Sequence, residues 1–424
     1  MVLGTAALFR DILSNIKPTT IQKSEFSRIS TLFISKLQKH AGGDATVIIG
    51  GSGAKDTWLA MSYDADIFVV FNKDKYAAKT NELSEIVEKW MKKAFSGFDV
   101  ERIHGSRDYF AVMFEGIRFE VVPIIGIASA AEALNITDIS PLHSIWVAKK
   151  GRDLTDEIRL AKQFCRAQGV YGAESHIRGF SGYILEILVI HYGGFEKFIA
   201  AAAKWKMPVI CDVEGYYPKK TVFFELNKSK LQSPLVVVDP VDKSRNASAA
   251  LSDEKFFTLI QGAKKWLKTH DSHMFDQNPV TVESLKKEHK KDVLLAIEVV
   301  MLSGKDDVVG VKILKAQEHM ERALKHFDVH AKGCVFEGRK AIIWFVLGVM
   351  KLPESFEQVG PPVDKVKFAS DFKDQHAGAF EKGGILYARV DHTVRDLSDF
   401  ISRVLAHKYV VERISKVEKV HILK

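Results

Sequence analysis

The spacing of apolar and polar residues divides the chain into a strand-rich part, a helical part and a mixed part. The first part begins with a helical segment over residues 6–40, and short apolar runs then predict strands at residues 47–49 and 67–71. Two longer runs, 109–114 and 117–125, flank Glu115-Gly116 and predict a β-hairpin.

Helical periodicity dominates from Asp153, which we expect to cap a helix that ends at Gly169. The pattern then predicts a helix at residues 180–192, a strand at 235–238 and a helix at 253–270. In the mixed part it predicts strands at 293–301, 341–347 and 384–390, a helix at 314–326 and a basic helix at the C-terminus. The expected fold class is therefore α+β with several domains, divided at residues 1–150, 151–275 and 276–424.

Composition is that of an ordinary globular protein, with 46% hydrophobic and 27% charged residues among 424. The formal net charge of +8 favours a polyanionic partner. No apolar run is long enough to cross a bilayer, and no signal-peptide pattern is present. Three scattered cysteines, Cys165, Cys211 and Cys334, lack metal-binding spacing and fit a reducing interior, so we expect a cytoplasmic protein.

The candidate catalytic residues lie at the end of the first predicted strand and at the start of the second. Gly50-Gly51-Ser52 follows the first strand, and Asp64 and Asp66 begin the second. Residues two apart in a strand point to the same face, and paired carboxylates suit Mg²⁺. Glycines let the backbone approach a ligand, and the N–H groups of such a turn attract anions. A D-x-D pair or a Gly-Gly-Ser turn alone is weak evidence, but the two in this order indicate nucleotidyl transfer from a nucleoside triphosphate.

Glu120 is the candidate third carboxylate. It is the single acid in the second strand of the expected hairpin, between Phe119 and Val121. An acid in an apolar strand is costly unless it is paired or bound to metal. The alternative is a glutamate on an edge strand that faces water.

Ser52, Asp64, Asp66 and Glu120 together resemble the site of the polymerase-β-like nucleotidyltransferases. Three further segments follow in the order found in the class I, archaeal-type CCA-adding enzymes: SPLHSIW, residues 171–193 and D-P-V-D-x-x-R-N at residues 239–246. The resemblance to this family extends over about residues 12–405. This resemblance implies a nucleotidyltransferase head, a helical neck that reads the nucleotide, and a ferredoxin-like body with a tail that binds tRNA. It also implies addition of C, C and A to the tRNA 3′ end from CTP and ATP, with two Mg²⁺ ions and no nucleic-acid template.

The resemblance also implies roles for single residues. Asp64, Asp66 and Glu120 would hold metal, while Ser52 and Lys55 would contact the triphosphate. His143, Lys162 and Tyr171 match nucleotide-contacting positions of the family, although by themselves they would be a structural histidine, a solvated lysine and a packed aromatic. Trp58 is expected to pack rather than to stack on a base.

Arg245 matches the base-reading arginine of the family. C and A both present an exocyclic amine where U and G present a carbonyl, so one fixed set of donors and acceptors can select both. The alternative for Arg245 is a salt bridge to Asp239 or Asp242. Arg178 and the lysines at positions 286, 287, 290 and 291 are candidate contacts to the tRNA backbone, each of which could equally be a solvated surface charge.

Three positions depart from the family pattern. Glu120 stands where aspartate is more usual, Gly53 where many members have a larger residue, and Met61 where a glycine is common. The short C-terminal tail leaves its contact with the tRNA elbow, and a homodimer, open. Two other classes remain at this stage: another terminal nucleotidyltransferase of the superfamily, such as a poly(A)-type polymerase, and a non-catalytic tRNA-binding relative.

Overall fold

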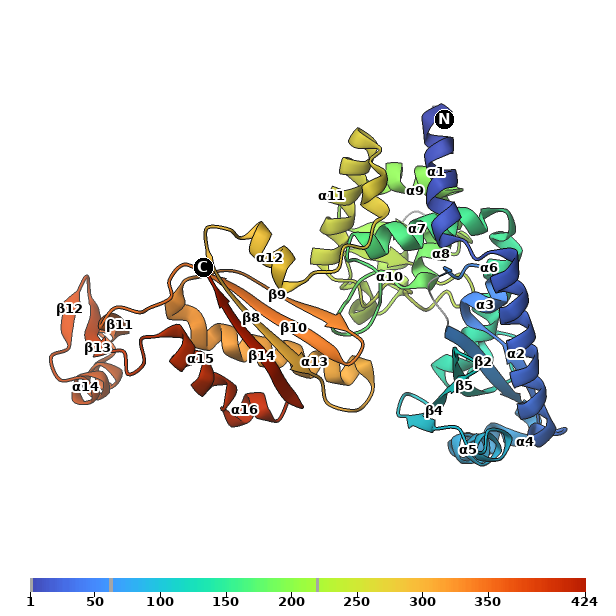
Figure 1. Cartoon of the computed structure of the whole chain (residues 1–424), viewed down its shortest axis with the longest axis horizontal. Coiled ribbons are helices and arrows are strands. Elements are labelled where there is room, and N and C mark those ends of the chain that lie inside the picture. Colours follow the sequence, from blue (N-terminus) through green and yellow to red (C-terminus); the bar gives the residue numbers. More distant parts are fainter. Residues whose placement is uncertain (1–2, 61–63, 219–220) are drawn as a thin grey trace. The chain divides into compact units, whose positions relative to one another are not determined.

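A computed structural model describes residues 3–60, 64–218 and 221–424 (Figure 1). The chain forms two compact units, Met1–Asn278 and Pro279–Lys424. None of the helices in the described ranges combines the length and the apolar character needed to cross a membrane.

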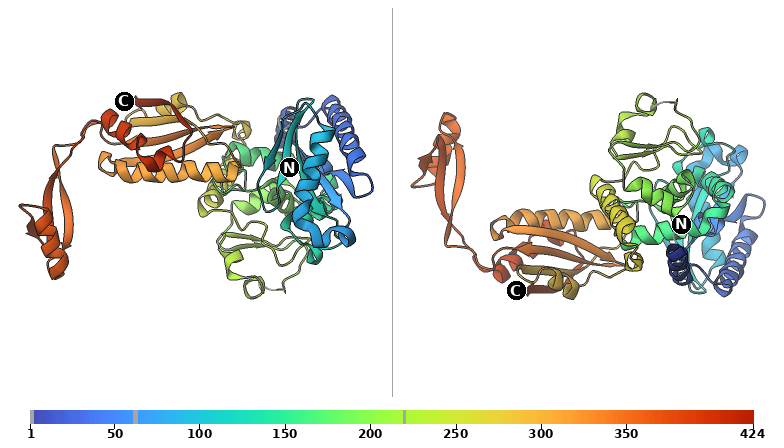
Figure 2. Two further views of the ribbon diagram at one scale, coloured as in Figure 1. Left: turned by 90° about the horizontal axis from the view of Figure 1, so that it is seen from below. Right: turned by 90° about the horizontal axis from the view of Figure 1, so that it is seen from above.

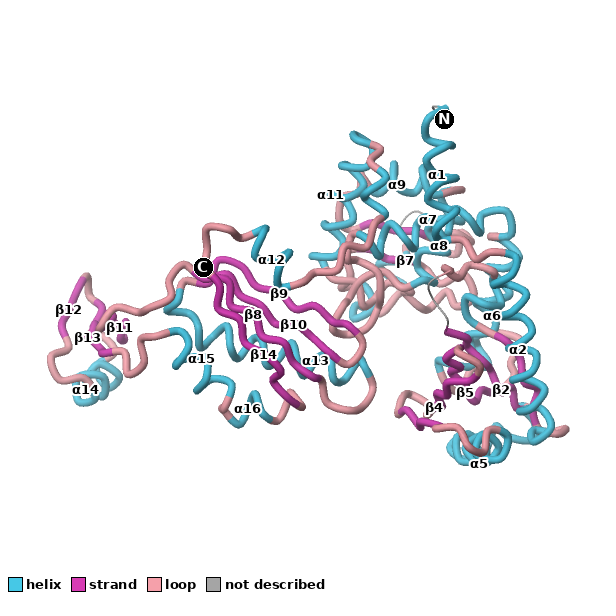
Figure 3. The backbone as a smooth tube through the Cα atoms, in the orientation of Figure 1, coloured by secondary structure: helices cyan, strands magenta, loops and turns pink. Residues whose placement is uncertain are grey.

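The first unit contains a five-stranded sheet in the order β1-β2-β5-β4-β3. Figure 3 labels its strands β2, β5 and β4. Its strands are β1 (Ala45–Ile49), β2 (Asp64–Phe71), β3 (Val100–Ile103), β4 (Tyr109–Phe114) and β5 (Ile117–Ile125). β2 and β5 pair in parallel, whereas the other pairs are antiparallel. The strands at residues 47–49 and 67–71 and the hairpin predicted from the sequence are confirmed.

One face of this sheet is covered by α2 (Thr20–Ala41) and α5 (Leu83–Ala94). α2 begins at a capping box, in which Thr19 and Gln22 bond reciprocally. Its Phe33 stacks on Phe119 of β5 at 4.0 Å between ring centroids. Because side chains alternate along a strand, burial of Ile67 and Phe119 in this core turns their even-numbered neighbours to the opposite face.

The helical part of the first unit packs around a separate aromatic core that includes Phe164, Phe195 and Trp266. Its helices are α6 (Ser140–Lys150), α7 (Thr155–Ala167), α8 (Gly182–Tyr192), α9 (Phe195–Ala202), α10 (Val222–Glu225) and α11 (Asp253–Thr269). A parallel pair, β6 (Val209–Cys211) and β7 (Leu235–Val237), joins them. α1 (Leu3–Ile16) also packs here through Phe9, so the predicted segment 6–40 is two helices that serve different cores.

The second unit contains an antiparallel sheet in the order β14-β8-β10-β9. Its elements are β8 (Val293–Val300), α13 (Asp306–Ala323), β9 (Val329–Glu337), β10 (Lys340–Leu347), α15 (Leu397–Leu405), α16 (Lys408–Val411) and β14 (Lys416–Leu423). α13 lies along one face of the sheet (Figure 2), and α12 (Val282–Glu288) packs on the other. The β-α-β-β-α-β order confirms the ferredoxin-like body.

A small sheet is inserted between the third and fourth strands of this body. It is formed by β11 (Ser355–Pro362), β13 (Ile385–Asp391) and β12 (Phe380–Lys382), with α14 (Val366–Gln375) beside it. The remaining short helices are α3 (Gly51–Lys55), α4 (Lys73–Tyr76), η1 (Ala77–Glu82), η2 (Ala130–Glu132), η3 (Ile136–Ile139), η4 (Arg152–Leu154), η6 (Lys228–Leu231), η7 (Ser272–Phe275) and η8 (Leu324–Phe327).

Two local predictions were wrong, and several strands were not predicted. Asp153 lies inside the short η4 and caps nothing, because α7 begins after Leu154 without a side-chain cap. The strands β3, β6, β9, β11 and β12 were not predicted from the sequence. The expected basic helix at the C-terminus is the strand β14, which pairs with β8 along most of its length. Lys416 and Lys419 lie on an edge strand of that sheet, where charge is common and helps to block further pairing.

Candidate active site

The glycine turn and the second strand are joined by the backbone. The Gly50 N–H donates to the Asp66 carbonyl oxygen at 2.8 Å, and Gly51 opens the short helix α3 with a positive φ of 53°. A Cβ at Gly51 would lie 1.6 Å from Asp66 Oδ2. The carboxylate of Asp66 therefore occupies the space that any side chain at position 51 would need.

Parallel pairing brings the predicted carboxylates onto one face of the sheet. Asp66 lies opposite Glu120, and Asp64 lies opposite Arg118. Burial raises the pKa of Asp66, an effect that nearby Lys55 opposes and Asp64 reinforces. Burial and the charge of Asp66 likewise raise the pKa of Glu120. Carboxylates that disfavour one another's ionisation in this way suit a bound cation, which would relieve the repulsion.

The carboxylates of Asp64, Asp66 and Glu120 are not arranged closely around one metal position. Arg118 Nε lies 3.3 Å from Glu120 Oε1 and partly neutralises that side chain. Across the described residues, no group of three or more His, Cys, Asp or Glu side chains is arranged closely enough to hold a metal ion. The chemistry of the donors fits Mg²⁺, which takes one or two protein carboxylates and completes its coordination with water and phosphate oxygens.

A buried ion-pair network lies where α3 meets the helical part. Lys55 Nζ is 2.6 Å from Glu186 Oε2, and Lys162 Nζ is 2.8 Å from Glu186 Oε1. Lys162 also donates to the carbonyl and hydroxyl oxygens of Thr57, at 3.1 and 2.9 Å. Burial alone would raise the pKa of Glu186, but the two lysines outweigh it and hold that pKa at about 2. The alternative of a solvated lysine at position 162 is therefore wrong.

Tyr171 lies beside this network. A Cβ at Gly182 would be 3.0 Å from the Tyr171 hydroxyl and 3.4 Å from Cε of Lys162, so both side chains lie close to that glycine. The Arg166 guanidinium lies 4.8 Å from the centroid of the Tyr171 ring. Burial raises the pKa of Tyr171, which keeps its hydroxyl protonated and able to donate a hydrogen bond.

His143 and Arg245 meet at a second buried carboxylate, Asp239. Arg245 Nη1 lies 2.6 Å and His143 Nε2 3.1 Å from Asp239 Oδ2, and the Tyr183 hydroxyl donates to Oδ1 at 3.1 Å. The rings of His143 and Tyr183 stack at 4.1 Å. The salt bridge to Asp239 that was the alternative for Arg245 is thus present, and it fixes the guanidinium while leaving the side chain about one-third exposed.

The loop that carries Arg245 is held from both sides. The Asn246 side chain accepts from the N–H groups of Val237 and Ser248 at 2.9 and 3.0 Å. The Tyr217 hydroxyl and Lys230 Nζ donate to the carbonyl oxygens of Lys243 and Ser244, each at 2.7 Å. The position of Arg245 is consequently set by the fold.

The structure brings Lys55, His143, Lys162 and Arg245 into one connected set of contacts through Glu186, Tyr183 and Asp239, and Tyr171 lies against Gly182 beside this set. Lys55 Nζ lies 5.9 Å from the Tyr183 ring centroid and so links the contacts around Glu186 with those around Asp239. Sequence reasoning missed Glu186, although it is a single acid in the apolar helix GYILEILVIHY, the same signal that identified Glu120.

The structure also shows where several other residues considered in the sequence analysis lie. Trp58 is buried and stacks on Phe26 at 5.0 Å, which confirms its packing role. Cys165 and Cys211 are buried thiols, whereas Cys334 is half-buried. Arg178 is exposed at a positive φ of 55°, and Lys286 is half-buried while the lysines at 287, 290 and 291 are exposed. Met61 lies outside the described residues.

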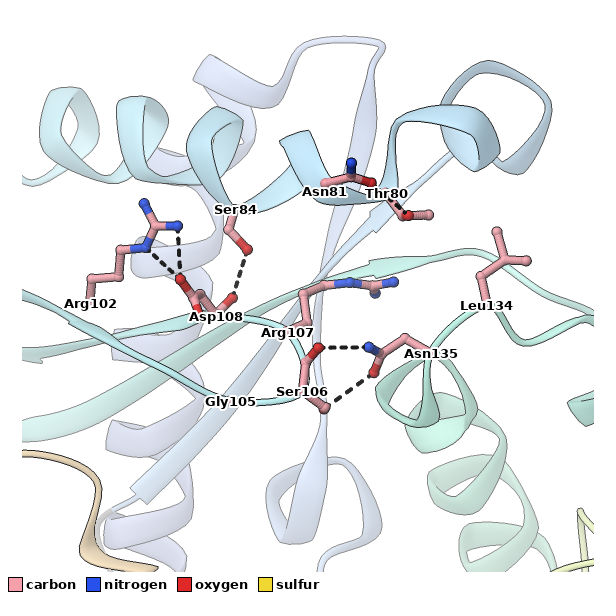
Figure 4. Close-up of a pocket in the computed structure, with 10 residues that line it drawn as sticks. All are labelled: Thr80, Asn81, Ser84, Arg102, Gly105, Ser106, Arg107, Asp108, Leu134 and Asn135. Atoms are coloured by element: carbon pink, nitrogen blue, oxygen red, sulfur yellow. Dashed lines mark hydrogen bonds and ion pairs between the residues drawn. The ribbon is translucent and has the colours of Figure 1, made fainter. Parts of the chain in front are cut away.

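A polar pocket of about 300 Å³ lies elsewhere on the first unit (Figure 4). It is bounded by η1, the start of α5 and the β3–β4 loop, and its residues include Arg102, Arg107, Asp108 and Asn135. This loop precedes β4, which runs antiparallel to β5, so the pocket is at the opposite end of the sheet from Asp64. None of the predicted site residues lines it.

Comparison with known proteins identifies two matching families. Residues 31–119 match the nucleotidyltransferase domain, and residues 156–276 match the second domain of tRNA nucleotidyltransferases. The chain is 34% identical over 355 residues to the CCA-adding enzyme of Nanoarchaeum equitans, which covers 82% of this chain and 84% of that protein. It is 29% identical over 379 residues to the CCA-adding enzyme of Methanosarcina mazei, covering 87% and 81%.

A solved structure shares the fold. A mutant of the Cid1 poly(U) polymerase bound to MgATP aligns with a TM-score of 0.52 at 12% identity, covering 66% of this chain and 100% of that chain. At this identity the likeness concerns the architecture alone.

Proposed function

This chain belongs to the family of CCA-adding enzymes, and we propose that it adds C, C and A to tRNA with the residues that surround Asp66. The observation that carries the proposal is the parallel pairing of β2 and β5. It sets Asp66 opposite Glu120, and Lys55 is close enough to oppose the rise that burial causes in the pKa of Asp66. A carboxylate face beside a cationic site matches what a nucleoside triphosphate and its metal require.

Asp64, Asp66 and Glu120 would hold two Mg²⁺ ions. When bound, such ions neutralise the triphosphate and favour attack by the 3′ hydroxyl of the tRNA with release of pyrophosphate. The protein contributes the orientation of the ligands. Gly51 fixes Asp66 from one side, and β5 carries Glu120 at the matching register.

The triphosphate would lie along α3, facing Ser52, Lys55 and Lys162. The first turn of a helix leaves backbone N–H groups without partners inside the helix, and these attract anions. The two lysines add positive charge, and the protonated Tyr171 hydroxyl adds a donor. His143 would approach the nucleotide from α6, where its ring stacks on Tyr183.

Arg245 would select the base. Its guanidinium is held by Asp239 through Nη1, and a planar fork of donors can still face the ring nitrogen of C or A. U and G would leave buried polar groups without partners, which disfavours their incorporation.

The assignment of Arg245 predicts a change in selectivity. In Arg245→Ala, the ratio of CTP to UTP incorporation should fall by about tenfold or more, because a charged hydrogen bond to the correct base is lost. Arg245→Lys should lose less, since it keeps the charge without the planar fork. Single-turnover addition of CTP, ATP and UTP to matched tRNA ends measures this. Lys243→Ala, an exposed change on the same loop, is the control, and an equal slowing of all three nucleotides in Arg245→Ala would contradict the role.

The proposed function is tested by incubating the chain with Mg²⁺, single labelled nucleotides and tRNA that lacks its 3′ C, C and A. Two C additions from CTP alone, followed by one A when ATP is supplied, are expected. Long A tracts from ATP alone would instead indicate a poly(A)-type polymerase. No extension of any end would indicate a non-catalytic tRNA-binding protein.

The partners follow from this activity. tRNA, CTP and ATP are the proposed substrates, and the charge of +8 favours the RNA. We place the enzyme in the cytoplasm, where three free thiols and a tRNA substrate are both expected.

A further inference from the structure

Glu186 is the one charged residue of α8 that lies wholly inside the first unit. Its side chain is 0% exposed, and the side chains of its partners Lys55 and Lys162 are 9% and 4% exposed. One carboxylate oxygen accepts from Lys55, and the other accepts from Lys162 and from the hydroxyl of Thr57 at 2.6 Å. Glu186 touches none of the carboxylates assigned to metal.

We infer that Glu186 is a positioning residue that holds Lys55 and Lys162 in the arrangement that receives the triphosphate. The inference rests on the proposed function, because it takes these two lysines as the phosphate contacts. It goes further because it assigns the arrangement of the two lysines to a residue that does not itself face the nucleotide.

The charges explain why such a residue is needed. Lys55 comes from α3 beside the sheet and Lys162 from α7 in the helical part, so no shared element fixes their separation. Two ammonium groups brought together in a region of low dielectric repel each other. A carboxylate between them removes this repulsion, and the trio keeps one net positive charge for the incoming phosphates.

Helix α8 also connects the two lysines with Arg245, the proposed base-reading residue. Tyr183 and Glu186 are three residues apart and therefore lie on the same face of the helix. Tyr183 donates to Asp239, which in turn holds Arg245 and His143. A single helix face thus orients the proposed phosphate contacts and the proposed base contact.

Removal of the negative charge has two opposing effects. A more positive site would attract phosphate more strongly, whereas unheld lysines would lose their geometry. The second effect should prevail, because both lysines are almost fully buried and water cannot replace the carboxylate as acceptor.

The test compares Glu186→Gln with the unmodified full-length chain. The affinity for inorganic pyrophosphate with Mg²⁺, measured by calorimetry, should weaken by about tenfold, as expected for loss of a charged hydrogen-bond partner at each lysine. KM for CTP and for ATP should rise by a similar factor, with a smaller change in kcat and an unchanged ratio of CTP to UTP incorporation. Glu186→Asp keeps the charge on a shorter side chain, so its pyrophosphate affinity should lie between those of the unmodified chain and Glu186→Gln.

Glu157→Gln is the matched control. Glu157 accepts the Phe195 N–H at 2.8 Å in the same helical part and touches neither lysine. It should leave the pyrophosphate affinity and both KM values unchanged, whatever stability it loses. If Glu157→Gln weakens pyrophosphate as much as Glu186→Gln does, the effect is general destabilisation and the inference is wrong.

Two further outcomes would overturn it: unchanged or tighter pyrophosphate binding in Glu186→Gln, and Glu186→Asp weaker than Glu186→Gln. If Glu186→Gln does not fold, the comparison of Glu186→Asp with Glu157→Gln decides the question in the same way. Failure of the proposed function looks different, since the unmodified chain would then not add C, C and A to a tRNA end, while the pyrophosphate measurement needs no extension.

Discussion

Replacing Asp66 with alanine should slow the addition of both C and A by about a thousandfold or more, because metal ligation supplies several kcal/mol of stabilisation to the transition state. Asp66 is the central carboxylate of the face: it lies opposite Glu120, and the charge of Asp64 reaches it. Affinity for tRNA should change only a few-fold, since Asp66 is not among the proposed contacts with the RNA backbone. Single-turnover extension and a filter-binding titration measure the two quantities.

Glu101→Ala is a suitable control for Asp66→Ala. Glu101 is an exposed acid on β3 of the same sheet, so its removal changes the net charge by the same amount at a site without a proposed ligand. It should keep the activity of the unmodified chain. Near-normal rates in Asp66→Ala would refute the metal assignment, and an equal loss in Glu101→Ala would show that the sheet tolerates no such change.

Gly51→Ala should reduce activity by about a hundredfold without adding any charge, because a misplacement of about 1 Å at a reacting centre has an effect of this size. The new Cβ would lie 1.6 Å from Asp66 Oδ2, so the carboxylate or the α3 backbone must move. The variant should still fold, since the change is small and lies at the rim of the core. Extension rates together with the thermal midpoint separate activity from stability.

Gly42→Ala isolates the backbone contribution. Gly42 has a φ of 54°, close to the 53° of Gly51, but a Cβ there meets nothing within 4 Å. Both variants place alanine at a positive φ, which costs on the order of 1–3 kcal/mol, and only Gly51→Ala displaces Asp66. Comparable activity in the two variants would mean that the contact between Gly51 and Asp66 has no part in catalysis.

Local patterns in the sequence were sufficient for most strands and for the hairpin that carries Glu120. The apolar runs of β4 and β5 and the Glu115-Gly116 turn are short-range signals, and the structure reproduces their limits. The C-terminal strand was mistaken for a helix because its pairing partner, β8, lies more than a hundred residues away. The irregular pairing between Val417 and Lys419 also interrupts the alternation of apolar and polar residues that would otherwise indicate a strand.

The sequence by itself determined which residue types are available: the D-x-D pair, the acid in β5, the glycine turn and the family resemblance that assigns roles to Lys55, Lys162 and Arg245. Only the tertiary structure decided how they meet. It set Asp66 opposite Glu120, pressed Asp66 against Gly51 and buried Lys162 on Glu186. Ion pairs between elements depend on distance and burial, and these arise from packing across long separations in the chain, whereas motifs and strand patterns depend on neighbours in sequence.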